Sequence, residues 1–347
     1  MIANPNSTSQ DAELFRKIIP VIRGVDGLDL LVKYTAFPGH AEEMCRGLRR
    51  SDYDAVIALG GDGTVNEMVN GLLGEPATDE QGLKRPAVSP EDLPALAVIP
   101  TGSANVFVRA LGFPAHPEEA AHVLARILQR DLRRQIRLGT WNDRWFAVNA
   151  GFGIDADVLA RVDRAREKGF AATPLRYFNI GIRAFFRTHK NPPRISVRAQ
   201  TETGKTFSES QLPLLFASNT NPWTFFGPMP VVTNPRNSFD QGLGLFGITE
   251  ISGLSGLAAM LYLVGLDSIG VINRMMGETL VQFDDAQTVE LDCDGPQRFQ
   301  SDGESEGKRE HVRLQSVPNA LEVFAPKEPR PASERSFTEM LRDLLRL

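Results

Sequence analysis

Apolar and polar residues alternate along the chain in two different ways, and the change falls near residue 138. In the first part, short apolar runs of the kind found in buried strands are followed by stretches with apolar residues at helical spacing. This pattern predicts strands at 28–32, 55–59 and 95–99 and helices at 40–50, 65–73 and 116–130. Strands and helices in alternation are typical of βαβ units. We therefore predict an α/β domain over residues 1–137, a parallel sheet with helices on both faces.

After Leu138 the apolar residues alternate over short runs, as in antiparallel strands. The runs predict strands at 194–198, 212–217, 243–249, 288–293, 311–315 and 320–324, with helices at 156–168 and 175–187 between them. We expect a β-rich, sandwich-like second domain over residues 138–316. Residues 317–347 are expected to return to the first domain and to end in a short helix that begins near Ser336. The polar, Pro- and Gly-rich stretch 74–94 has no periodicity, which predicts a mobile surface loop.

Composition narrows the class of protein. The 347 residues are 42% hydrophobic and 23% charged with a net charge of −5, which fits two ordinary globular domains and argues against nonspecific nucleic-acid binding. The two cysteines are too few for a disulfide framework or a thiolate zinc site, which favours a reduced, intracellular protein. The first ten residues lack the features of a signal peptide, and the uncharged stretch 251–266 is too short to span a bilayer. We expect a cytoplasmic protein.

A glycine-rich turn, Gly60-Gly61-Asp62-Gly63-Thr64, lies between a predicted strand and a predicted helix. Glycines tolerate positive φ and let a ligand approach the backbone, while the N–H groups of a helix start can bind phosphate. The same turn also occurs for steric reasons in proteins that bind nothing. Asp62 is placed either to orient a metal ion or to anchor the turn. A second loop, 100–105, follows the next strand, and neighbouring parallel strands converge on one crevice.

Several segments resemble the bacterial diacylglycerol kinase family, whose catalytic domain is shared with sphingosine and ceramide kinases. They are NPNS at 4–7, GGDGTVNEMVNGLL at 60–73, PTGSANVFVRALGFP at 100–114, NAGFGIDA at 149–156 and SDGE at 301–304. GGDGT alone is also found in NAD kinases. The resemblance implies a two-domain kinase with ATP bound between the domains. Carried over by position, the nucleotide would contact Asn4, Thr35, Gly60, Gly61, Asp62, Gly63, Thr64, Val65, Asn66, Gly102 and Ser103.

Two carboxylates, Asp302 and Glu304, flank Gly303, and in an extended chain both would point to one face. Composition alone would also fit a solvated acidic loop. The resemblance implies that Glu304 is the proton acceptor, with Asp302 beside it, and that Mg²⁺ is the metal, with Asp302 and Asp62 near it. Bacterial members hold a second Mg²⁺ in an Asp-Gly-Leu turn. Here Gln241 stands at the position of that aspartate, so that Asp240, one residue earlier, is the candidate ligand.

The resulting interpretation is an ATP- and Mg²⁺-dependent lipid kinase that phosphorylates diacylglycerol or a similar lipid. Residues Arg161 to Arg194 carry a strong excess of basic over acidic side chains, interleaved with aromatics, which fits peripheral binding to an anionic inner membrane surface. The same pattern also fits helices that pack in the core with a solvated basic face. An NAD kinase-type soluble kinase and a non-catalytic nucleotide or lipid sensor remain as alternatives. A homodimer is possible by the resemblance, and the acceptor lipid is left open.

Overall fold

The protein is described by a computed structural model over residues 1–5, 12–153, 192–226, 229–250 and 279–326. The predicted helices at 156–168 and 175–187, the uncharged stretch 251–266 and the helix expected after Ser336 lie outside these residues. The chain forms two compact units. Within the described residues, the first comprises Met1–Ala147 and 317–326, and the second comprises Val148–Ser316.

Parallel strands form the centre of the first unit in the order β6 (Ala95–Pro100), β3 (Ala55–Gly60), β1 (Ile2–Ala3) and β2 (Lys33–Tyr34). The last part of β17 (Glu304–Phe324) adds to the other side of β6, with Val323 opposite Leu96. β3 and β6 are buried almost throughout, as their continuous apolar runs predict. The strand expected at 28–32 is wrong: the strand begins only at Lys33, and both residues of β2 are exposed.

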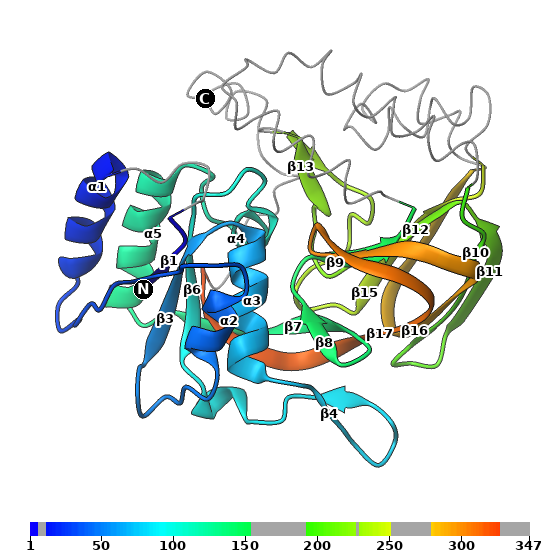
Figure 1. Ribbon diagram of the computed structural model, residues 1–347, viewed down its shortest axis with the longest axis horizontal. Helices are drawn as coiled ribbons and strands as arrows, with labels where there is room; N and C mark the ends of the chain where they lie inside the picture. The colour runs from blue at the N-terminus through cyan, green and yellow to red at the C-terminus, as the bar shows by residue number, and fades with distance from the viewer. Residues whose placement is uncertain (6–11, 154–191, 227–228, 251–278, 327–347) are drawn as a thin grey trace. The chain divides into compact units, whose positions relative to one another are not determined.

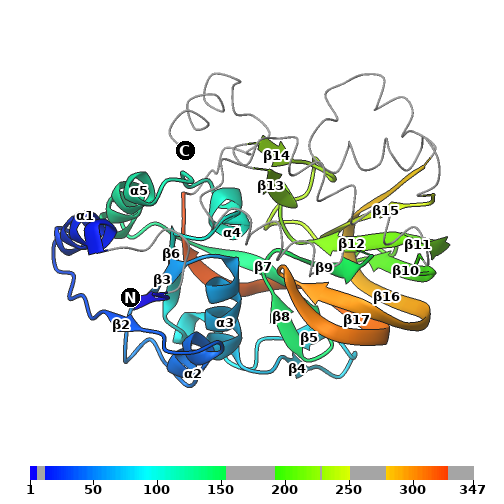
Figure 2. The same ribbon diagram turned by 45° about the horizontal axis from the view of Figure 1, so that its top comes forward.

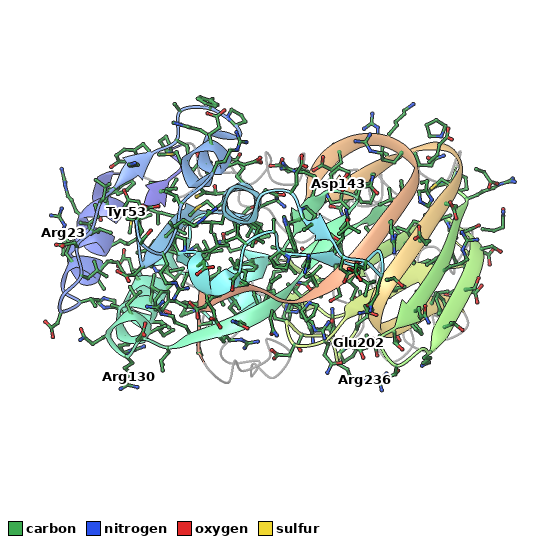
Figure 3. All side chains as sticks on the ribbon, turned by 90° about the horizontal axis from the view of Figure 1, so that it is seen from below. Arg23, Tyr53, Arg130, Asp143, Glu202 and Arg236 are labelled. Atoms are coloured by element: carbon green, nitrogen blue, oxygen red, sulfur yellow. The ribbon has the colours of Figure 1, made fainter. Side chains whose placement is uncertain are left out.

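Helices cover both faces of this sheet (Figures 1 and 2). α1 (Ala12–Arg23) packs with α5 (Pro117–Gln129) on one face, and α2 (His40–Cys45) packs with α3 (Asp62–Leu73) on the other. α1 was not predicted from the sequence, although Leu14, Ile18 and Ile22 are buried at a spacing of four residues. The side chains of Arg23 and Arg130, at the ends of α1 and α5, lie on the surface (Figure 3).

The first unit continues past residue 137 through a hairpin of β7 (Arg133–Trp141) and β8 (Arg144–Phe146). The fully buried Trp145 binds this hairpin to α3, because its backbone N–H donates to Asn70 Oδ1 (3.0 Å) and its carbonyl accepts from Asn70 Nδ2 (3.1 Å). The stretch 74–94 was expected to have no regular structure, and this is wrong in part. It contains the paired strands β4 (Ala77–Thr78) and β5 (Lys84–Arg85) and a 3₁₀ turn.

Antiparallel strands dominate the second unit. They are β9 (Asn149–Phe152), β10 (Ile195–Thr201), β11 (Thr206–Leu212), β12 (Leu214–Ser218), β15 (Leu243–Ile248), β16 (Leu280–Ser301) and the first part of β17, with a small hairpin of β13 (Thr224–Phe226) and β14 (Met229–Val231). β16 pairs with β15 near its start and with β9 near its end, and β12 pairs with both β15 and β9. These four strands thus form a closed ring of pairings. The fold class, an α/β unit followed by a β-rich antiparallel unit, is confirmed.

Candidate functional site

Four predicted nucleotide-binding segments follow the carboxyl ends of neighbouring parallel strands in the first unit. One of them is the glycine-rich turn 60–64, which follows β3. Asn4 follows β1 and donates its N–H to Leu59 O (3.2 Å), and Thr35 follows β2 and donates to Ala3 O (2.9 Å). Thr101 follows β6 and donates to Gly60 O (3.0 Å). These bonds join adjacent strands at the same edge of the sheet, which we call the carboxyl edge of the first unit. In open α/β sheets this edge is where ligands bind.

The two glycine-rich loops touch each other at this edge. A Cβ added at Gly102 would lie 2.6 Å from the Cα of Gly61, and one added at Gly61 would lie 3.1 Å from the Cα of Gly102. A Cβ at Gly60 would lie 2.5 Å from Thr64 Oγ1. Gly60, Gly61 and Gly63 all lie outside the positive-φ region that glycine tolerates. Glycine is needed at these positions because the two backbones approach each other closely. Without side chains at Gly61 and Gly102, a ligand at this edge would meet the main chain.

Asp62 joins the two loops. Its carboxylate lies in the first turn of α3 and accepts hydrogen bonds from the N–H groups of Val106 and Phe107, both at 2.9 Å. These two residues open α4 (Val106–Ala110), so the negative charge lies at the start of a helix, where it is stabilised. Of the two roles considered for Asp62, anchoring the turn has direct support. The Val106 side chain is buried, while its N–H forms this bond.

Asn105 shapes the second loop from within. It adopts the left-handed conformation with φ 50°, which asparagine tolerates better than most residues. Its side-chain oxygen accepts from Gly102 N (2.9 Å), and its Nδ2 donates to Gly102 O (2.7 Å). The amide therefore closes residues 102–105 into a tight loop and leaves Ser103 exposed at its tip.

The other residues of α3 that were predicted to contact the nucleotide differ in burial. Gly63 is half-buried near the start of the helix, whereas Thr64 and Val65 are buried, so that Val65 is a core residue. The Asn66 side chain bonds to Asn70 Nδ2 (3.1 Å) and to the carbonyl of Trp145 (3.3 Å). Of α3, the first turn therefore lies at the carboxyl edge. Asn66 links α3 to the β7–β8 hairpin.

Glu67 and Gly71 in the same stretch have packing roles. The Glu67 carboxylate accepts from the N–H groups of Gly39 (2.8 Å) and Ala41 (3.1 Å) and so caps the start of α2. A Cβ on Gly71 would overlap the Glu42 carbonyl oxygen, so glycine permits close packing of α2 on α3. Glu67 and Gly71 thus hold α2 against α3.

The second unit carries the two candidate carboxylates at a hairpin turn. Asp302 and Gly303 connect β16 to β17 with φ of 49° and 87°, and Ser301 pairs with Glu304 across the turn. The expectation that Asp302 and Glu304 share a face in extended chain is therefore wrong, because Asp302 lies in the turn and Glu304 is the first residue of the next strand. Asp-Gly is a preferred sequence for a two-residue turn with two left-handed positions.

The two side chains differ sharply in environment. Asp302 is 8% exposed, its Oδ1 accepts from the N–H groups of Val148 (2.8 Å) and Asn149 (3.0 Å), and its own N–H donates to Asn149 O (2.8 Å). Glu304 is exposed. Asp302 thus anchors the turn to the start of β9, and Glu304 is the carboxylate of the pair that solvent or a substrate can reach.

The candidate metal ligands do not form one cluster. Over the described parts of the chain, no group of three or more His, Cys, Asp or Glu side chains could hold a metal ion. Asp240 is exposed, and the N–H of Gly242 nearby is bound by Asp285 Oδ1 at 2.7 Å. Within the described residues, no helix is both long and apolar enough to cross a membrane. The basic segment Arg161 to Arg194 falls almost wholly outside these residues.

Comparisons with known proteins agree with this geometry. Residues 1–156 match the diacylglycerol kinase catalytic domain family. The chain is 26% identical to a diacylglycerol kinase of Staphylococcus haemolyticus over 94% of this chain and 88% of that protein. It is 31% identical to the diacylglycerol kinase of Bacillus subtilis, over 44% of this chain and 45% of that one. A probable YegS-like lipid kinase of Chromohalobacter salexigens is 34% identical over 38% of this chain and 37% of its own length.

Solved structures show the same fold. A putative diacylglycerol kinase from Bacillus anthracis superposes with a TM-score of 0.66 at 21% identity, covering 95% of each chain. A second structure of a diacylglycerol kinase from that organism gives a TM-score of 0.63 at 18% identity. Residues 1–156 therefore match the diacylglycerol kinase catalytic domain family, and the chain is similar to bacterial diacylglycerol kinases over most of its length.

Proposed function

We propose that the protein is a lipid kinase that transfers the γ-phosphate of ATP to the free hydroxyl of diacylglycerol, or of a lipid with a similar headgroup. Phosphatidic acid would be the product from diacylglycerol. The observation that carries the proposal is the contact between Gly61 and Gly102 at the carboxyl edge, in a domain of the kinase family. Diacylglycerol as the acceptor is supported by the relatives that align with 94% of the chain.

The residues present fit a nucleotide. The loops 60–64 and 100–105 meet at Gly61 and Gly102, where there is no room for a Cβ on Gly102. The surface at this point is therefore formed by backbone atoms. The dipole of α3 favours the negative charge of phosphates near its first turn. Ser103 offers a hydroxyl at the tip of the second loop. We therefore assign the phosphates of ATP to Gly60, Gly61, Gly63, Gly102 and Ser103.

Glu304 is our candidate for the proton acceptor. Transfer of a phosphoryl group to an alcohol is assisted by a base that takes the hydroxyl proton, and an exposed carboxylate on a well-held turn suits this role. Its neighbour Asp302 already accepts two N–H groups, which suits a residue that holds the turn.

Mg²⁺ fits the chemistry of these donors, because it binds oxygen ligands and uses only one or two carboxylates when phosphates supply the others. When bound with ATP, it neutralises charge on the phosphates. Asp302 and Asp62 are the candidate ligands by the resemblance, and Asp240 is the candidate for a second ion.

The membrane supplies the substrate in this proposal. A diacylglycerol keeps its acyl chains in a bilayer, so the enzyme has to bind the membrane surface from the cytoplasm. The basic segment Arg161 to Arg194 would attract anionic headgroups. If so, changing Arg176, Arg183 and Arg187 together to alanine abolishes sedimentation with phosphatidylglycerol vesicles. Unchanged sedimentation would refute this part.

The test of function is transfer of labelled phosphate from Mg-ATP to a panel of acceptors. Diacylglycerol, ceramide, a sphingoid base and a total lipid extract are presented in mixed micelles, and NAD is presented in solution. Label in phosphatidic acid supports the proposal, and label in another lipid would keep the lipid kinase and change the acceptor. Label only in NADP would move the protein to the soluble kinases. Binding of ATP without transfer would indicate a sensor.

A further inference from the structure

A chain of buried side-chain amides lies directly behind the Asp302–Gly303 turn. Gln300, 1% exposed, accepts a hydrogen bond from the Gly303 N–H at its Oε1 (3.0 Å) and donates from its Nε2 to Asn149 Oδ1 (2.8 Å). Asn149, 7% exposed, donates from its Nδ2 to the carbonyl of Trp223 (3.0 Å). The bonds run without interruption from the backbone of Trp223 to the backbone of Gly303.

The order of donors and acceptors in this chain is fixed. An amide has one oxygen that accepts and one nitrogen that donates, so each of the two amides can serve both its neighbours in only one orientation. Because both amides are buried, loss of any of these bonds leaves a polar group without water to replace its partner. The Gly303 N–H is therefore held at a defined position.

The main chain of Asn149 also binds the turn, through Asp302. Asn149 supplies its backbone N–H to Asp302 Oδ1 and its carbonyl to the Asp302 N–H. Residue 149 thus binds Asp302 through its main chain and Gly303 through its side chain and Gln300. Both residues that precede Glu304, Asp302 and Gly303, are therefore held by hydrogen bonds.

Both turn residues have positive φ, and only a few bonds of the backbone separate them from Glu304. A rotation at Gly303, the most permissive residue of the turn, would swing the start of β17 and redirect the Glu304 side chain. A direct restraint on Gly303 is the bond from its N–H to the Gln300 side chain. The direction of Glu304 therefore depends on Gln300.

We propose that Gln300 and Asn149 are positioning residues, which lock the Asp302–Gly303 turn so that the Glu304 carboxylate points at the lipid hydroxyl. This inference rests on the proposed function, in which Glu304 takes the proton. Neither amide contacts the substrate in this proposal. They act through the turn.

The test compares Gln300→Leu with two further variants in steady-state transfer of phosphate to diacylglycerol. Gln300→Leu removes both bonds at nearly constant volume, and Gln300→Glu keeps an acceptor for the Gly303 N–H. Asn237→Leu is the control, because Asn237 is a buried amide of the same unit that donates to Ser218 O and Thr220 O. The Tm of each variant shows how much stability it loses.

We expect Gln300→Leu to lower kcat by about ten- to a hundredfold with the KM for ATP unchanged, since small misplacements of a reacting group are this costly. Gln300→Glu should have a kcat between those of the wild type and Gln300→Leu, because it keeps the acceptor for the Gly303 N–H and loses the bond to Asn149 Oδ1. Asn237→Leu should keep kcat within about twofold even where its Tm falls as far. In a Glu304→Gln background, Gln300→Leu should have no further effect on kcat, because the group that it positions is gone. A full further loss in that background, or an equal loss in the control, would overturn the proposal.

Hydrogen exchange separates this proposal from the proposed function. If the wild type phosphorylates no lipid, the proposed function fails, and exchange at the Gly303 amide still tests the lock. Slow exchange in the wild type that becomes fast in Gln300→Leu but not in Asn237→Leu supports the lock. Equal exchange rates in all three proteins would contradict it, and this measurement also applies if Gln300→Leu is too unstable for kinetics.

Discussion

Replacing Asp62 by asparagine tests the link between the two glycine-rich loops. The carboxylate accepts two backbone N–H groups, one at each oxygen, from Val106 and Phe107. Asparagine keeps one oxygen and turns its NH₂ group toward the other N–H. One hydrogen bond is lost, and the remaining one is no longer assisted by a charge.

The expected cost follows from these two bonds. A hydrogen bond to a charged group contributes about 1.5–3 kcal/mol, and a buried N–H that loses its partner adds a desolvation penalty of similar size. We therefore expect Asp62→Asn to lower the free energy of unfolding of the first unit by about 2–3 kcal/mol. The matched control is Asp143→Asn. Asp143 lies at the surface, with its side chain 71% exposed and paired to Lys84, and an exposed pair contributes below about 1 kcal/mol (Figure 3).

The measurement is urea unfolding followed by tryptophan fluorescence in a Trp223→Phe background. Trp141 and Trp145 then report on the first unit alone. ATP binding is measured by calorimetry on the same proteins, and Asp62→Asn should weaken it by at least tenfold, because the loops lose their mutual anchor. If Asp62→Asn and Asp143→Asn unfold within about 0.5 kcal/mol of each other, the anchoring role is refuted.

Three further predictions concern close packing and burial. Gly102→Ala should weaken ATP binding at least tenfold, since its Cβ would overlap the facing loop; unchanged calorimetric affinity would contradict this. Gly71→Ala should destabilise the first unit by about 1–3 kcal/mol in urea unfolding, because its Cβ has no room beneath α2, and an unchanged midpoint would argue against this packing. Burial raises the pKa of the Cys45 and Cys293 thiols to about 12 each, so both should resist iodoacetamide at pH 8 until urea is added. Rapid alkylation of the native protein would contradict this burial. Because the thiols of the unfolded chain ionise from about pH 9, the free energy of unfolding should also fall as the pH rises above 9.

The parts of the fold that the sequence predicted are those with one dominant period. The apolar runs at 55–59 and 95–99 became β3 and β6 because central parallel strands are buried on both sides. β2 was misplaced because an exposed strand of two residues has no apolar signal. The single strand β16 was predicted only at 288–293, since its alternation is broken by Asp294, Gly295 and a register shift after Asp292.

The candidate site shows the same limit. Glycine-rich loops after two strands were sufficient to bring Gly61 and Gly102 to one edge, because the topology of a parallel sheet determines where strands end. The roles of Asp302 and Gln300 were not predictable from spacing, because they depend on a hairpin turn and on bonds to residue 149, far away in the sequence. An Asp-Gly pair between two β-type runs is a hairpin signal that the extended-chain interpretation overlooked.

The rate of phosphate transfer in Glu304→Gln tests the central claim most directly. Glu310→Gln is the control, because Glu310 is an exposed carboxylate on the same strand β17. We expect Glu304→Gln to lower kcat for diacylglycerol by about 10²–10⁴-fold, the usual contribution of a general base, while ATP affinity and Tm stay unchanged. Glu310→Gln should transfer phosphate at the rate of the wild type. Equal rates in all three proteins would contradict the assignment of Glu304 as the proton acceptor.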